Sequence, residues 1–251
     1  STASGIPDYR DANGDWKRNS PILFQEFIND EHMRRRYWAR SLIGWRHLSN
    51  AQPNAAHESL AELESQGRIE LLVTQNVDGL HQAAGSSNVV DLHGRIDKIR
   101  CLSCNADLPR KAMQTAVERL NPGFARLDAR SAPDGDADLD DIDFSSFDVP
   151  DCQTCNGMLK PDVVFFGERV PDERVSQAMA AVDAADAMLI VGSSLMVWSG
   201  FRFAKAAAAA GKPVAAINMG RTRADDLLQF KVAQSCTDVL PAVVGAAASP
   251  R

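Results

Sequence analysis

Residues 69–81 read IELLVTQNVDGLH, an apolar run of β-forming residues that passes directly into a polar stretch. Similar apolar runs occur at Ala187 to Val191 and at Pro213 to Ile217, and a helical pattern at Phe201 to Ala210 separates those two. Apolar strands that alternate with helices are typical of a parallel sheet covered on both faces. We therefore predict an α/β fold built on a parallel sheet with helices on both faces.

The polar residues Gln75, Asn76 and Asp78 come directly after the first predicted strand. Open α/β sheets bind their ligands beyond the carboxyl ends of their strands, so we predict a ligand site here. Further along, residues 91–94 read DLHG and place His93 in a polar turn. A lone histidine is more often a core or surface residue, but this turn makes His93 a candidate general base.

Four of the five cysteines form two C-x-x-C pairs, Cys101 with Cys104 and Cys152 with Cys155. Two such pairs complete a closed tetrahedral Cys₄ set, which suits structural zinc. A redox dithiol or plain buried thiols are the alternatives, and the two matched pairs argue against them. Metal ligation rather than a disulfide framework indicates a reducing compartment. For Cys236, the fifth cysteine, we predict a small buried side chain.

The composition excludes several classes of function. A net charge of -6 argues against a general grip on nucleic acid, and no apolar run approaches the roughly 20 residues of a membrane span. With 251 residues the chain can form one large domain, with or without a smaller insert. We predict that residues 134–143, DGDADLDDID, form a solvated loop or flexible insertion. A calcium loop is the alternative, but the stretch lacks the central glycine and terminal glutamate of an EF-hand.

Several motifs follow one another in a fixed order: GIPDYR at Gly5 to Arg10, then TQNVDGLHQAAG, DLHGRI, CLSC, CQTC, LKPDVVFFGE, VGSSLMV and INMG. In this order, and over nearly the whole chain, they resemble the sirtuin family. Two further stretches resemble class II of that family, the branch with the animal mitochondrial lipoamidase and ADP-ribosyltransferase sirtuin. They are RRRYWARSLIGW at Arg34 to Trp45 and APDGD at Ala132 to Asp136.

The resemblance implies an NAD-dependent protein lysine deacylase, which transfers the acyl group to ADP-ribose and releases nicotinamide. NAD would be the co-substrate, and Zn²⁺ would be structural. A protein mono-ADP-ribosyltransferase with the same NAD site is the alternative, because both reactions begin with departure of nicotinamide. A non-enzymatic module that binds NAD or acyl-lysine would leave His93 dispensable. A zinc-ribbon interaction protein would leave QNVD and DLHG without a role.

The resemblance also implies how the chain divides into domains. Residues 1–30, 55–95 and 160–251 are expected to form a Rossmann-like NAD-binding domain. Residues 31–54 are expected to be the helical part of a smaller domain. Residues 96–159 are expected to be a zinc-binding module that carries the class II insertion.

The residues that the resemblance assigns to NAD fall into separate stretches. The loop that closes over NAD is expected to contain Ser1, Ala3, Pro7, Asp8, Tyr9 and Arg10. The nicotinamide ribose is assigned to Gln75 and Asn76, and the nicotinamide amide to Val77 and Asp78. The phosphates and ribose are assigned to Gly192, Ser193 and Ser194, and the adenosine end to Asn218, Met219, Gly220 and the backbone of Cys236.

The catalytic residues that the resemblance implies are His93, Asn76 and Asp78. Asp78 would hold the nicotinamide amide, so that nicotinamide leaves more readily and the acyl oxygen attacks C1′ of the ribose. His93 would then take a proton from the ribose hydroxyls, so that O2′ attacks the acyl carbon. A general base of this kind contributes roughly 10²- to 10⁴-fold in rate.

The resemblance assigns the substrate lysine to an apolar tunnel opposite Met196 to Trp198, a stretch that includes Val197. The tunnel residues are Val164, Phe165, Phe166, Gly167 and Glu168. Edge hydrogen bonds around Gly167 would bind a peptide by strand addition. The alternative for the VVFF stretch is an ordinary core strand.

Tyr37 and Arg40 have the spacing of the tyrosine and arginine with which desuccinylating sirtuins hold a carboxylate. A guanidinium group pairs well with a carboxylate. Our hypothesis is therefore an acidic or bulky acyl group, such as a glutaryl-type group, rather than acetyl. The alternative is that Arg40 only packs or pairs on its helix.

We expect the partner to be an acylated lysine of a protein substrate, with no nucleic acid and no membrane, and the enzyme to be a monomer. The expected location is the bacterial cytoplasm, or the mitochondrial matrix if the source is eukaryotic. Members of the family carry a strand and a Gly-Ala-Gly turn just before the position of Ser1. We expect this segment to precede Ser1 in the natural protein.

Overall fold

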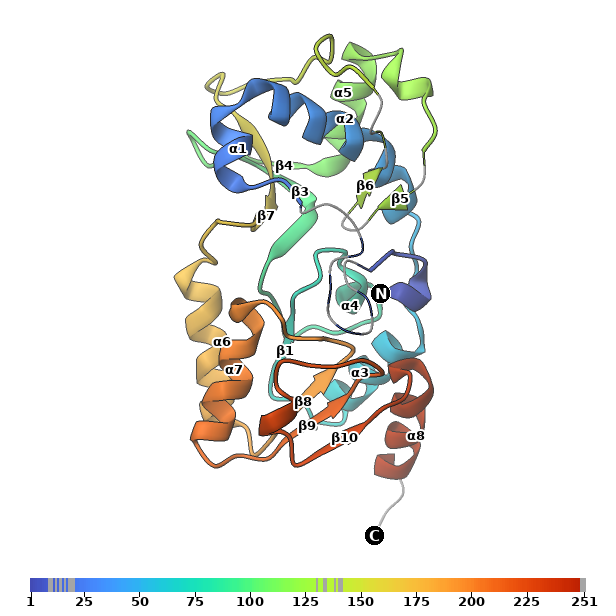
Figure 1. Cartoon of the computed structure of the whole chain (residues 1–251), viewed down its shortest axis with the longest axis vertical. Coiled ribbons are helices and arrows are strands. Elements are labelled where there is room, and N and C mark those ends of the chain that lie inside the picture. Colours follow the sequence, from blue (N-terminus) through green and yellow to red (C-terminus); the bar gives the residue numbers. More distant parts are fainter. Residues whose placement is uncertain are drawn as a thin grey trace.

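The computed structural model describes residues 1–8, 11, 13, 15, 17, 21–129, 131, 132, 135–137, 139 and 142–248, without the side chains of 131, 132, 247 and 248. Figure 1 shows two halves, one above the other, joined by strands and loops. No helix in the described part of the chain combines the length and the apolar character that crossing a membrane requires.

The lower half contains the parallel strands that the sequence predicts. The strands β1 and β2 pair in parallel, and β8, β9 and β10 form a second parallel sheet with β9 in the middle. Their bounds are β1 Leu72–Thr74, β2 Val89–Asp91, β8 Met188–Val191, β9 Val214–Ile217 and β10 Phe230–Val232. The prediction of parallel strands is confirmed, although the strand predicted at Ile69 to Thr74 begins only at Leu72.

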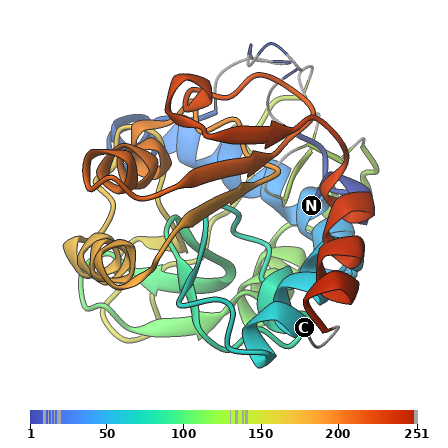
Figure 2. The same ribbon diagram turned by 90° about the horizontal axis from the view of Figure 1, so that it is seen from below.

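Helices cover both sides of these strands, as Figure 2 shows from below. The helix α6 packs on α7 on one side, and α3 packs on α8 on the other. Their bounds are α3 Ala55–Ser65, α6 Asp172–Ala184, α7 Trp198–Ala209 and α8 Cys236–Ala248, and the short α4 spans Leu80–Ala83. At the start of α3, Asn54 Oδ1 accepts from the Ala56 N–H at 3.0 Å, which is the N-cap expected of asparagine.

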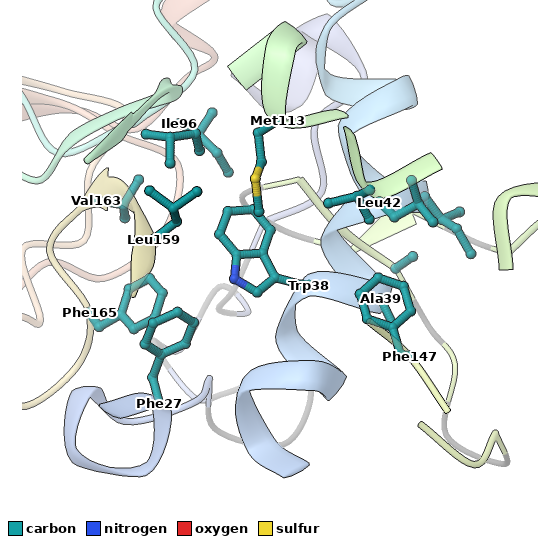
Figure 3. Close-up of a cluster of buried hydrophobic side chains, with 14 of the residues drawn as sticks. Phe27, Trp38, Ala39, Leu42, Ile96, Met113, Phe147, Leu159, Val163 and Phe165 are labelled. Carbon is teal, nitrogen blue, oxygen red and sulfur yellow. The ribbon is translucent and has the colours of Figure 1, made fainter. Parts of the chain in front are cut away.

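The upper half contains an antiparallel sheet in the order β4-β3-β7, with α1, α2 and α5 around it (Figure 1). The bounds are α1 Phe24–Asn29, α2 Glu31–Leu48, β3 Gly94–Cys101, β4 Asp107–Pro109, α5 Arg110–Leu120 and β7 Leu159–Val163. The short helices are η1 Thr2–Ser4, η2 Phe124–Arg126 and η4 Asp225–Leu227. Figure 3 shows the core of this half, where Trp38 lies beside Met113 and Phe27 lies against Phe165.

The acidic stretch is attached to this half more firmly than a solvated loop would be. Its described residues include β6 (Asp136–Ala137), which pairs with β5 (Ser131–Ala132) and lies against α2. Ala137 is fully buried and Leu139 is 6% exposed. Two apolar residues between the acidic ones, Ala137 and Leu139, are therefore part of the core, although the composition of the stretch is mostly acidic.

The predicted domain boundaries stay predictions, but two of them divide packed elements. Across position 30, α1 packs on α2, and Phe27 shares a core with Trp38. Across position 160, β7 pairs with β3. The turn between β2 and β3 and the segment after β7 connect the halves; the turn carries His93, and the segment carries the predicted tunnel residues 164–168.

Candidate active site

Polar residues gather at the carboxyl ends of the parallel strands. Gln75 follows β1, Ser193 comes two residues after β8, and Asn218 follows β9. Ser193 Oγ donates to Gln75 Oε1 at 3.0 Å, so two of these strand ends are in direct contact. Because the ends of parallel strands meet at one edge, these side chains form the kind of polar rim that binds nucleotides in α/β proteins.

Asn76, Asp78 and Ser1 form a connected group beside this rim. Ser1 Oγ donates to Asp78 Oδ2, and Asn76 Nδ2 donates to Ser1 Oγ at 2.9 Å. The other carboxylate oxygen of Asp78 accepts from the Leu80 N–H at 2.9 Å and so fixes the turn into α4. Val77, between the two polar residues, is buried. The buried side chain of Val77 therefore anchors the loop, whereas the neighbouring Asn76 is exposed.

His93 lies between β2 and β3, with both ring nitrogens in hydrogen-bond contact. Nδ1 is 3.0 Å from the carbonyl oxygen of Gln75, and Nε2 is 2.8 Å from Ser199 Oγ. Burial lowers the pKa of His93 below its usual value; the Gln75 carbonyl opposes this shift, and the charge of Arg174 adds to it. The ring is therefore neutral at neutral pH, as a general base must be.

Gly94 fixes the position of His93 because no other residue fits there. Its φ is +82°, and a Cβ would lie 1.9 Å from the Asp162 carbonyl oxygen. The glycine thus lets β3 pass close to β7 directly after the histidine. The DLHG motif therefore has a structural reason for its glycine as well as a chemical reason for its histidine.

The four predicted zinc ligands come together. Cys101 Sγ is 3.5 Å from Cys155 Sγ, Cys104 Sγ is 3.7 Å from Cys152 Sγ, and all four sulfurs lie within 4.8 Å of one another. A zinc tetrahedron with Zn–S bonds of about 2.3 Å requires sulfurs about 3.8 Å apart, which these spacings fit.

Each cysteine pair has the same local structure. Asn105 and Asn156 follow the two pairs in left-handed conformations, with φ of 57° and 56°. Their N–H groups donate to the carbonyls of Cys101 and Cys152 at 3.0 and 2.8 Å. Backbone N–H groups of Cys104 and Ser103 lower the pKa of Cys101 to about 6, which favours the thiolate that binds metal. Contact with the neighbouring thiols instead raises the pKa of Cys155 to about 12.

The predicted substrate residues follow β7. Phe166 forms a parallel bridge with Leu23, and its carbonyl accepts from the Phe24 N–H at 2.9 Å. Glu168 accepts from the Phe165 N–H at 2.8 Å and pairs with buried Lys160 at 3.0 Å. The turn is therefore held by an internal ion pair, while Gly167 is exposed at its tip.

The structure brings Tyr37 and Arg40 to different neighbours. The Tyr37 ring lies 5.4 Å from Phe27 and 5.1 Å from Phe165. Arg40 makes a two-pronged ion pair with Asp136 of β6, with N–O distances of 2.9 to 3.1 Å. The Arg40 guanidinium group, which the sequence predicts to hold an acyl carboxylate, is therefore paired with a carboxylate of the chain itself.

The remaining predicted NAD residues lie in several places. Ala3 lies in η1, and Asp8 pairs with Lys17 at 2.6 Å. Pro7 is in the same N-terminal stretch, whereas Tyr9 and Arg10 lie outside the described residues. Gly192 and Ser194 flank Ser193, and the Gly220 carbonyl accepts from Asn218 Nδ2 at 2.8 Å. Met219 is exposed. Cys236 is half-buried at the start of α8, and a Cβ on Gly192 would lie 3.5 Å from its Sγ.

Sequence reasoning missed Ser199 and Lys160. Ser199 is the second residue of α7, two positions after Val197. The only hint of a role in the sequence is that its hydroxyl lies among mostly apolar residues at the start of a helix. Lys160 lies within LKPDVVFFGE, where its neighbours in the sequence give no sign that it is buried. Burial of a lysine inside a strand becomes visible only once Glu168 and the Phe165 ring, 4.6 Å away, are placed against it.

Comparison with known proteins identifies the family of the chain. The model of the Sir2 family matches residues 1–199. An "NAD-dependent protein deacetylase" of Xanthomonas campestris is 62% identical over 96% of this chain and 82% of the relative. One of Bordetella bronchiseptica with the same name is 60% identical over 97% and 89%.

Solved structures show the same fold. A "Sir2-p53 peptide-NAD+" complex matches with a TM-score of 0.73 and 27% identity, over 98% of this chain and 88% of the other. A Sir2 homologue in complex with NAD also has a TM-score of 0.73, with 30% identity over 98% and 84%. The match to the family model and the identity with these relatives show that the chain belongs to the Sir2, or sirtuin, family.

Proposed function

We propose that the chain is an NAD-dependent protein lysine deacylase with His93 as its general base. Its membership of the Sir2 family and the names of its bacterial relatives support this activity. The observation that carries the proposal is the position of His93, a neutral and half-buried ring at the polar rim, next to the loop of Asn76 and Asp78.

The polar rim is suited to hold NAD. Gln75, Ser193 and Asn218 would bind its ribose, phosphate and adenosine groups, each from the end of a different parallel strand. Asp78 and Asn76 would orient the nicotinamide side. When bound, NAD supplies an electrophilic ribose carbon as nicotinamide departs.

In the proposed reaction, Nε2 of His93 accepts the proton of a hydroxyl. Nδ1 faces the Gln75 carbonyl oxygen, which can only accept a hydrogen bond, so Nε2 is the atom free to take a proton. A hydroxyl that loses its proton to Nε2 becomes a stronger nucleophile toward the acyl carbon. Burial of the ring keeps Nε2 unprotonated at neutral pH.

The zinc would be structural rather than catalytic. Four thiolates close its coordination, so no position is left for water or substrate. The two knuckles join the end of β3 to the stretch before β7, and these are the strands that frame His93 and the substrate turn. The metal would therefore support the site through the upper half.

The proposed acyl preference depends on the ion pair that Arg40 makes. Arg40 is paired with Asp136, so an acidic acyl group would have to compete with that carboxylate for the guanidinium group. A neutral acyl group would not. We propose deacylation of acyl-lysine as the activity. Turnover of a panel of acyl-lysine peptides measures whether an acidic acyl group is preferred.

Mass spectrometry of products tests the proposal. The protein is incubated with NAD and peptides that carry acetyl-, succinyl- or glutaryl-lysine. Wild type is expected to give free lysine, nicotinamide and O-acyl-ADP-ribose. His93→Ala is expected to lower turnover roughly 10²- to 10⁴-fold, because the general base is gone, while NAD binding by calorimetry is retained. ADP-ribosylated protein without O-acyl-ADP-ribose would instead favour the mono-ADP-ribosyltransferase.

A further inference from the structure

Ser199 is the residue in direct contact with the proposed base that has no assigned role. Its Oγ lies 2.8 Å from His93 Nε2, and the residue is 8% exposed. It comes from the first turn of α7, far from His93 in the sequence. The contact involves the same nitrogen that must take the proton.

The hydrogen-bond partners fix the direction of this contact. The Gln75 carbonyl can only accept, so the proton of the neutral ring lies on Nδ1. Nε2 then has a lone pair and no proton. The Ser199 hydroxyl therefore donates to Nε2, and the hydroxyl occupies the position from which an attacking hydroxyl would approach the base.

The first turn of α7 is fitted closely to this site. Gly200 follows Ser199, and a Cβ there would lie 2.6 Å from the Gln75 side chain. Gln75 in turn accepts from Ser193 Oγ, and its carbonyl faces His93. The start of α7, the end of β1 and the base therefore form one connected set of contacts.

We propose that Ser199 is a positioning residue for His93: its hydroxyl holds the ring so that Nε2, which the Gln75 contact leaves unprotonated, points toward α7 until a substrate hydroxyl replaces it. The inference rests on the proposed function, in which Nε2 takes the proton of that hydroxyl. In that step the O–H bond of the substrate breaks and an Nε2–H bond forms. Ser199 keeps its own proton and takes no part in the transfer.

The test compares Ser199→Ala with Ser199→Thr, which keeps the hydroxyl. Ser59→Ala is the matched control, because Ser59 is 6% exposed and its hydroxyl donates to a backbone carbonyl within α3 and not to His93. Two rates are measured: acyl transfer to ADP-ribose, and exchange of labelled nicotinamide into NAD. The exchange reports nicotinamide departure, which precedes the action of the base.

Ser199→Ala is expected to lower kcat for acyl transfer by up to about 100-fold, as a misplaced catalytic group does, with exchange nearly unchanged. Ser199→Thr is expected to recover most of the loss, and Ser59→Ala to resemble wild type. Nitrogen-15 NMR of the five histidine rings gives a readout without turnover. His93 is expected to keep the Nδ1–H tautomer in both proteins, because the Gln75 carbonyl requires it, and the nitrogen-15 shift of Nε2 is expected to change in Ser199→Ala, where its hydrogen bond is lost.

An unchanged acyl-transfer rate and an unchanged Nε2 shift of His93 in Ser199→Ala would overturn the inference. Equal loss of exchange and acyl transfer would also overturn it, because Ser199 would then serve NAD binding or folding instead of the base. Failure of the proposed function looks different: wild type would form no O-acyl-ADP-ribose. The NMR comparison would still report on Ser199 in that case.

Discussion

Arg40 is paired with a carboxylate of the chain itself, and this pairing bears on the proposed acyl preference. Its ion pair with Asp136 joins residues 96 positions apart, and the arginine side chain is 14% exposed. Replacing Asp136 with asparagine removes the competing charge and keeps the shape of the side chain. We predict that Asp136→Asn raises glutaryl-lysine turnover relative to acetyl-lysine turnover, measured as the ratio of kcat/KM for the two peptides.

The matched control for this prediction is Asp172→Asn, which breaks an exposed ion pair with Arg169 at the surface. This variant is expected to leave the ratio unchanged, because exposed pairs of this kind contribute little. The same ratio in Asp136→Asn and wild type would mean that Arg40 does not meet the acyl group. Tyr37 and Arg40 would then be structural residues of α2.

At the residue scale, spacing predicted the zinc ligands, and the polar turn with its glycine pointed to His93. The partners of these residues could not be predicted in the same way. Ser199 is 106 positions from His93, and Asp136 lies in a charge-dense stretch that reads as solvated. Pairs of this kind depend on how elements pack, so no local pattern in the sequence carries them.

At the scale of elements, the two cysteine knuckles make a prediction about metal content. We predict one zinc per chain, and we expect Cys104→Ser to lose zinc and unfold at a lower temperature. The reason is that zinc binding contributes on the order of 10 kcal/mol to the folding of such a module. Atomic emission measures the metal, and thermal unfolding by circular dichroism measures the stability.

Cys236→Ser is the control for metal content, because this cysteine lies outside the four-sulfur cluster. It is expected to keep a full equivalent of zinc. If Cys104→Ser also kept its zinc, the cluster would not be the metal site, and the thiol contacts of 3.5 and 3.7 Å would be simple packing.

The elements that the sequence predicted are those with regular patterns. The apolar runs became β1, β8 and β9, and Asn54 capped α3. The strand β3 was missed because its register shifts between Arg95 and Ile99, which breaks the alternation of buried and exposed residues. The strand β7 was missed because it contains a lysine and a proline, which are unusual in a buried strand. The lysine can be buried there because it pairs with Glu168, and the sequence does not reveal this pair.

For the whole molecule, the proposed base His93 lies in the turn between β2 and β3 that connects the two halves, and other histidines pack close to the proposed site. His57 of α3 and His81 of α4 illustrate this, with ring centroids 4.8 Å apart just behind the Asp78 loop. Burial, followed by the charge of His81, lowers the pKa of His57 from 6.5 to about 4. Burial also lowers the pKa of His81.

These shifts predict how stability varies with pH. The folded chain keeps His57 neutral, whereas the unfolded chain protonates it below pH 6.5, so the free energy of unfolding falls as the pH drops from about 6.5 toward 4. Between pH 7.5 and pH 5 the wild type is expected to lose about 2 kcal/mol more than His57→Gln, which accepts the same Asn54 N–H bond but does not titrate.

Urea unfolding at the two pH values measures this difference. His32→Gln, at an exposed position on α2, controls for the loss of any histidine and is expected to follow the wild type. Loss of zinc in acid affects all three proteins alike and cancels in the comparison. Equal losses in His57→Gln and wild type would show that His57 is protonated in the folded chain at pH 5. The contact between α3 and α4 behind the Asp78 loop would then tolerate a charge that its burial opposes.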